Sequence, residues 1–113
     1  MKSAAQTSES VRKANDLAEI ERLIGYYRSI AGILRKSGCE ALERLAASWD
    51  TALPQLAQKL ASSSGSQDYR LAKKGLRQGL KEVPEIIASK QGLDHAQLIS
   101  LIEAELNIKF ADL

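Results

Sequence analysis

The sequence predicts an all-α protein, an antiparallel up-down bundle of about four helices, and three observations lead to this fold class. Apolar residues recur at intervals of three and four positions over long segments, which is helical spacing. Short polar segments that contain glycine or serine separate these stretches. No segment alternates apolar and polar residues as a half-buried strand would. Three long helices and one shorter helix, joined by short connections, favour the up-down arrangement.

The first helix is expected from about Ser8 to Lys36, where the helical periodicity is clearest. Its inward-facing stripe consists of Leu17, Ile20, Ile24, Tyr27, Ala31 and Leu34. Three further apolar residues, Leu23, Ile30 and Ile33, widen this stripe, as packing within a bundle requires. We therefore expect the stripe to be largely buried along its whole length, from Leu17 through Ile24 to Leu34.

The chain of 113 residues suits one domain. Residues 1–8 are mostly small and polar, and we expect them to form a disordered N-terminal leader. Residues 9–113 then form a single helical-bundle domain.

The second and third helices each contain a proline. A capping-box pattern at residues 37–40 precedes the second helix, which extends to about Ala61, and the third is expected over residues 67–90. Between them lies a serine- and glycine-rich loop at 62–66. Pro54 and Pro84 each remove a helical donor, so a kinked helix and two shorter helices both fit each pattern.

Asp94 has the character of a cap at the start of the fourth helix, and Asn107 is a suitable left-handed residue at its end. Phe110 is expected to fold back as an apolar plug. Gly75 and Gly79 lie four positions apart inside the third helix and form a smooth strip. Close packing within the bundle is favoured for this strip over a groove for a partner.

Composition and motifs exclude several classes of protein. The single cysteine, Cys39, cannot form an internal disulfide, and no apolar run is long enough for a secretory signal or a membrane span. We therefore expect a cytoplasmic protein with no membrane partner. No nucleotide-binding, zinc, di-iron or hydrolase motif is present, so we expect no enzymatic activity, catalytic residue, metal or cofactor.

One weak alternative involves a thiol. In an up-down bundle the second and fourth helices begin at the same end, which brings Cys39 and His95 to that end, each in the first turn of a helix. A helix N-terminus favours the thiolate of cysteine. The simpler interpretation is a half-buried cysteine and a solvated histidine, because nothing in the sequence orients the imidazole.

The strongest signal is the distribution of charge. The whole chain has a net charge of +2, yet segment 69–90 has six positive and two negative side chains, while 91–113 has one positive and four negative. Five basic residues of the third helix share an arc of about 100°. They are Arg70, Lys73, Lys74, Arg77 and Lys81. These residues are the expected anion- or partner-binding site, forming a solvent-exposed strip that faces the acidic last helix, an acidic protein, nucleic acid or only solvent.

The function predicted from these features is a small non-enzymatic interaction or regulatory module that presents helix faces to a protein partner. The alternative is a nucleic-acid-associated protein that uses the basic face of the third helix. A thiol-based site at the Cys39/His95 end is a further alternative. The sequence leaves the oligomeric state open.

Overall fold

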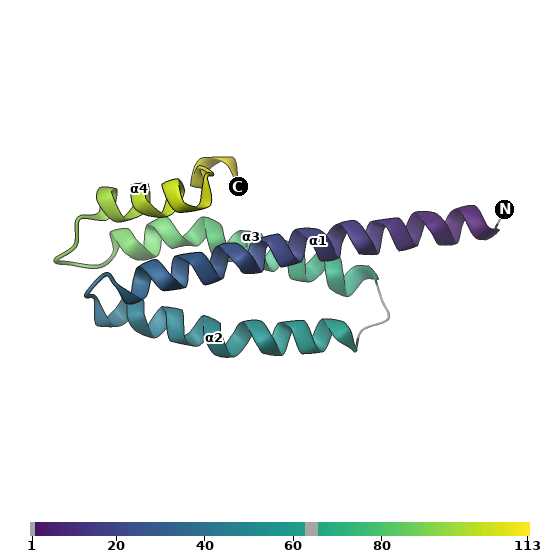
Figure 1. Ribbon diagram of the computed structural model, residues 1–113, viewed down its shortest axis with the longest axis horizontal. Coiled ribbons are helices and arrows are strands. Elements are labelled where there is room, and N and C mark those ends of the chain that lie inside the picture. The colour runs from purple at the N-terminus through teal and green to yellow at the C-terminus, as the bar shows by residue number, and fades with distance from the viewer. Residues whose placement is uncertain (1, 63–65) are drawn as a thin grey trace.

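The structure is a computed structural model that describes residues 2–62 and 66–113, with side chains described over 11–62 and 67–113. Four α-helices and a short 3-10 helix follow one another in these ranges. They are α1 (Lys2–Arg35), α2 (Glu40–Ala61), α3 (Ser66–Ala88), α4 (His95–Leu106) and η1 (Phe110–Asp112). The described residues contain no strand, and successive helices reverse direction, which confirms the predicted helical bundle (Figure 1).

The bundle is built around two parallel neighbours, α1 and α3. Both α1 and α3 run in the same direction and pack against each other, with α2 on one side of this pair and α4 on the other (Figure 1). The molecule is elongated, with extents of 60 × 26 × 19 Å, because the first turns of α1 project beyond the other helices (Figure 1). The central contact between α1 and α3 matters for the site described below.

The first helix begins at Lys2, earlier than the expected start near Ser8. Residues 2–8, predicted as a disordered leader, therefore have helical backbone, while Met1 lies outside the described residues. The first turns include Lys2, Ala4, Ala5 and Gln6, which are good helix formers. The division of the chain into a leader and a domain stays a prediction.

Leu17 is 38% exposed, so the expectation that the whole stripe of α1 is buried was wrong at its N-terminal end. Ile24 is half-buried, and Ala31 is 2% exposed. These residues are spaced seven apart, and a straight α-helix drifts by about 20° over each heptad. The drift moves the side chain from the edge of the interface at Leu17 toward its centre at Ala31. The most deeply buried positions of α1 are Ile20, Leu23, Ile30 and Leu34.

The helix ends follow local chemistry. The Asp94 carboxylate accepts a hydrogen bond from the backbone N–H of Gln97 at 3.0 Å, and Asn107 has a left-handed φ of 55°, so both predicted ends of α4 are confirmed. The predicted capping box at 37–40 was wrong, because Cys39 is the residue preceding α2 and makes no side-chain cap. The Ser37 hydroxyl donates to the carbonyl oxygen of Leu34 at the end of α1, and its oxygen accepts a hydrogen bond from the backbone N–H of Cys39 at 3.2 Å, so only the acceptor role of Ser37 is as expected.

Both prolines are accommodated within continuous helices. Pro54 lies inside α2 and Pro84 inside α3, and each helix continues for several residues beyond its proline. The interpretation of each segment as two shorter helices is therefore wrong.

A buried tyrosine joins three helices. The Tyr27 ring meets Trp49 of α2 edge to face, with 4.8 Å between ring centroids, and its hydroxyl donates to the Leu76 carbonyl of α3 at 2.6 Å. A side chain at Gly79 would overlap this hydroxyl, whereas the space around Gly75 is open. The predicted close packing is therefore found at Gly79 but not at Gly75.

Burial, with a smaller contribution from the charge of Glu82, raises the pKa of Tyr27 from 10.0 to about 12. Because the folded pKa lies above the unfolded one, the stabilisation is full below pH 10 and is lost as the pH rises through about 12. We expect Tyr27→Phe to remove this loss, at a cost of about 1 kcal/mol near neutral pH from the missing hydrogen bond. Urea unfolding of both proteins at pH 8 and pH 11 measures the difference. Equal sensitivity of the two proteins to high pH would contradict it.

Candidate functional site

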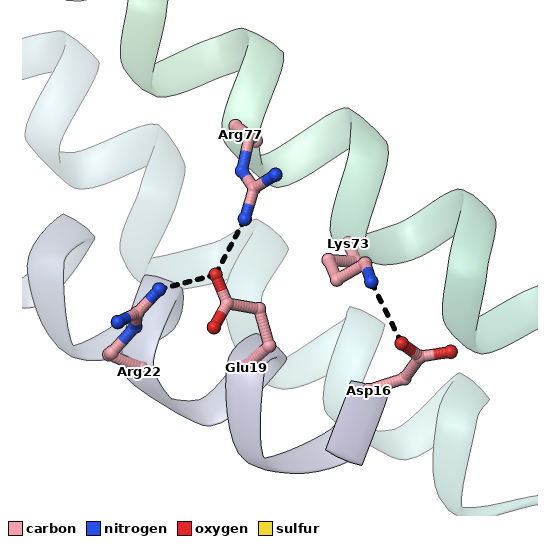
Figure 2. Close-up of polar contacts among 5 residues, drawn as sticks. All are labelled: Asp16, Glu19, Arg22, Lys73 and Arg77. Carbon is pink, nitrogen blue, oxygen red and sulfur yellow. Dashed lines mark hydrogen bonds and ion pairs between the residues drawn. The ribbon is translucent and has the colours of Figure 1, made fainter. Parts of the chain in front are cut away.

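Two of the five predicted basic residues form ion pairs with the neighbouring helix and are only partly exposed. Lys73 Nζ donates to Asp16 Oδ1 at 2.8 Å, and the Arg77 guanidinium donates to Glu19 Oε1 at 2.7 Å (Figure 2). The same oxygen of Glu19 also accepts from Arg22, one turn along α1, at 2.5 Å. Lys73 and Arg77 are both partly buried at this seam. A fully exposed strip of five residues was therefore a wrong prediction at these two positions.

The opposing carboxylates belong to α1, and sequence reasoning had not considered that helix as their source. Within the chain, the acidic last helix was the one source of carboxylates that the sequence suggested, beside an acidic protein, nucleic acid or solvent. Here α1 and α3 are parallel neighbours, which aligns Asp16 and Glu19, three apart, with Lys73 and Arg77, four apart. The similar spacing of the two pairs, about one helical turn in each, was the feature of the sequence that could have indicated this pairing.

The electrostatics of Glu19 reflect this pairing. Burial alone would raise the pKa of Glu19, but hydrogen bonds and charges from Arg22 and Arg77 outweigh it and hold that pKa below its ordinary value of 4.5. In return, the hydrogen bond to Glu19 raises the pKa of Arg22. A lowered carboxylate pKa stabilises the fold above the unfolded value, and this contribution is lost as the pH falls through the folded value.

We expect the double variant Lys73→Glu with Arg77→Glu to lower the free energy of unfolding by about 2 kcal/mol. Each partly exposed pair is worth up to about 1 kcal/mol, and charge reversal adds repulsion against Asp16 and Glu19. Thermal and urea unfolding measure the loss. Exchanging the charges on α1 as well, with Asp16→Lys and Glu19→Lys, should restore most of it. No recovery in this quadruple variant would show that the pairs do not carry the effect.

The remaining three basic residues form what we call the outer basic row: Arg70, Lys74 and Lys81. All three are exposed, and within the described part of the chain none forms an ion pair. At 100° per residue they share an arc of about 40° on α3, and at 1.5 Å per residue they extend over roughly 17 Å. Like charges on one face repel one another unless an anion lies opposite them.

The possible thiol site has the predicted location. Lys36 and Ser37, at the end of α1, border the same pocket as Asp94 and Gln97, so the starts of α2 and α4 lie at one end of the molecule. The imidazole Nε2 of His95 contacts the Lys90 carbonyl oxygen, so the ring is oriented after all, contrary to the sequence-based expectation.

Cys39 and His95 share a location at this end of the molecule, but the described structure shows no interaction between them. Among the described residues no hydrogen bond joins Cys39 to His95. The described residues contain no group of three histidine, cysteine, aspartate or glutamate side chains that could hold a metal ion. Thiol chemistry at this end stays a prediction.

None of the described helices is long and apolar enough to cross a membrane. No protein-family model matches the sequence, and no curated protein or solved structure matches it significantly. Among the described surfaces of the chain, the outer basic row is the most distinctive.

Proposed function

We propose that the protein is a non-enzymatic interaction module whose outer basic row binds an acidic surface of a protein partner. The observation that carries the proposal is the division of the five basic residues of α3. Lys73 and Arg77 are neutralised by carboxylates of α1, whereas Arg70, Lys74 and Lys81 are exposed without an ion pair in the described structure. Complementary charge on a partner relieves the repulsion within the row and speeds association.

Nucleic acid is the alternative ligand, and the reduced number of free cations makes it the weaker one. Each phosphate neutralised contributes about −0.9 to the slope of log affinity against log salt, so three cations give about −2.7. A protein that makes about 6–10 phosphate contacts gains correspondingly more from the release of counterions. The row also carries no aromatic side chain on which bases would stack.

The proposed setting is the cytoplasm, in agreement with a chain that has one cysteine and no disulfide partner for it. A regulatory role follows from the mechanism, because a contact built on a few exposed charges is weak and reversible. Partner binding of this kind requires neither a cofactor nor a catalytic group.

The test compares two charge-reversal variants with equal change in net charge. In the first, Arg70, Lys74 and Lys81 become glutamate. In the second, three exposed cations outside α3 become glutamate: Arg28, Arg44 and Lys109. Each protein is used as bait in host extract, with and without nuclease, and captured proteins are quantified by mass spectrometry.

We expect the wild type and the second variant to capture the same acidic protein. The first variant should not capture it, and nuclease treatment should not release it. Loss after nuclease treatment would favour the nucleic-acid alternative. Equal loss in both variants would show that overall charge, and not the outer basic row, decides capture. Both variants should retain the wild-type melting temperature within a few degrees, because the substituted positions are exposed.

A further inference from the structure

An apolar groove lies beside the outer basic row, between the last turns of α2 and the first turns of α3. Its volume is about 250 Å³, and it is lined by Leu56, Lys59, Leu60, Asp68, Leu71 and Ala72. Leu71 is 57% exposed, the most exposed of the large hydrophobic side chains in the described part of the chain. A leucine on the open rim of an apolar groove is the arrangement in which a partner's side chain gains most from burial.

The rims of the groove are predominantly basic. Lys59 of α2 lines one side and is exposed. On the other side Lys74 lies one helical turn from Leu71. Asp68 also lines the groove, so two cations, Lys59 and Lys74, lie around it against one carboxylate. The surroundings of the groove therefore have a net positive charge, which complements an acidic ligand.

The size of the groove favours a side chain over a free small molecule. Pockets for small ligands have volumes of about 300–1,000 Å³ and enclose most of the ligand. This groove is smaller and open, and its lining residues come from two antiparallel helices, α2 and α3. An amphipathic helix inserts isolated apolar side chains into such a channel while its polar flanks contact the rims.

We infer that this groove is the docking site for one amphipathic helix of an acidic protein partner. The inference rests on the proposed function and adds the form of the ligand. An apolar side chain of that helix packs between Leu56 and Leu71, and carboxylates on its flanks pair with Lys59 and Lys74. The outer basic row then supplies orientation and association rate, while the groove supplies most of the affinity.

The test uses two labelled synthetic peptides that carry the same number of negative charges. One is an amphipathic helix with leucines along one face and glutamates on its flanks, and the other is poly-glutamate. Binding to the full chain is measured by fluorescence anisotropy at low salt. The variants are Leu71→Ala, Lys74→Glu and, as a matched control, Leu101→Ala. Leu101 is 54% exposed and lies on α4, away from this groove.

We expect the wild type to bind the amphipathic peptide more tightly than poly-glutamate. Leu71→Ala should weaken binding of the amphipathic peptide by about tenfold or more, because truncation of a central apolar anchor removes packing. Binding of poly-glutamate should stay unchanged, because the substitution removes no charge. Lys74→Glu should weaken both peptides, and Leu101→Ala neither. Because both leucines are exposed, their truncation should leave the fold intact.

Other results separate the two proposals. Unchanged binding of the amphipathic peptide to Leu71→Ala would overturn the groove and leave charge recognition standing. If the wild type binds neither peptide, both proposals fail together. A second copy of this chain is the other occupant to consider. Self-association in sedimentation experiments that disappears in Leu71→Ala would identify that copy as the ligand and overturn the acidic partner.

Discussion

Ile30→Ala is expected to lower the free energy of unfolding by about 2–5 kcal/mol, the range measured when large buried aliphatic side chains are truncated. Ile30 has no exposed surface and is one of the most deeply buried residues of α1. Its truncation removes favourable burial and leaves a cavity that close-packed neighbours fill only in part. The result is measured by urea unfolding at constant m-value, which separates a change in stability from a change in the unfolded state.

Two neighbouring substitutions provide a graded comparison along the same helix. Ile24 is half-buried, so Ile24→Ala should cost about 1–2 kcal/mol, less than the same change at Ile30. Leu17 is 38% exposed, and Leu17→Ala should change stability by about 0.5 kcal/mol or less. We therefore expect the loss of stability to be largest at Ile30, smaller at Ile24 and smallest at Leu17. A cost at Leu17 equal to that at Ile30 would mean that a partner or a second copy covers the N-terminal half of α1.

The success of the fold prediction has a simple physical basis. Helical spacing, the cap at Asp94 and the left-handed Asn107 depend on residues close together in the sequence, and the structure confirms each of them. The extent of burial along α1 depends on longer distances. A stripe written as alternating steps of three and four follows a period of 3.5, and over two heptads the real helix rotates away from it by about 40°. The error therefore appears at Leu17, at one end of the stripe.

The candidate site was predicted only in part, because a sequence contains charge but not the identity of the neighbouring helix. The basic arc of α3 was evident from spacing alone. Its division into paired and free residues was not, since it depends on α1 and α3 being adjacent. The partner of Lys73, Asp16, lies 57 positions away in the sequence. The groove at Leu71 escaped notice for the same reason, because its two walls belong to different helices.

Gly79→Ala is expected to lower the free energy of unfolding by about 1–3 kcal/mol, although alanine is the better helix former. A methyl group at this position would overlap the Tyr27 hydroxyl, which donates to the Leu76 carbonyl. Relief of the overlap requires movement of a buried ring that also packs against Trp49, and overpacking of this kind has a cost in that range. Gly75→Ala is the matched control on the same helix. Open space surrounds Gly75, so alanine there should stabilise the protein by about 0.4–1 kcal/mol.

The double variant Tyr27→Phe with Gly79→Ala tests whether the hydroxyl is the cause. Phenylalanine lacks the overlapping oxygen, and the next atom of the ring, Cζ, lies 3.4 Å from the position of the added methyl carbon, an ordinary contact distance. In the Tyr27→Phe background we therefore expect Gly79→Ala to be neutral or slightly stabilising, like Gly75→Ala. The two changes would then show a coupling free energy of about 1–3 kcal/mol in a double-mutant cycle measured by urea unfolding. Additive effects would mean that the cost at Gly79 arises from the helix itself, and that the closeness of α1 and α3 at this point does not depend on a glycine.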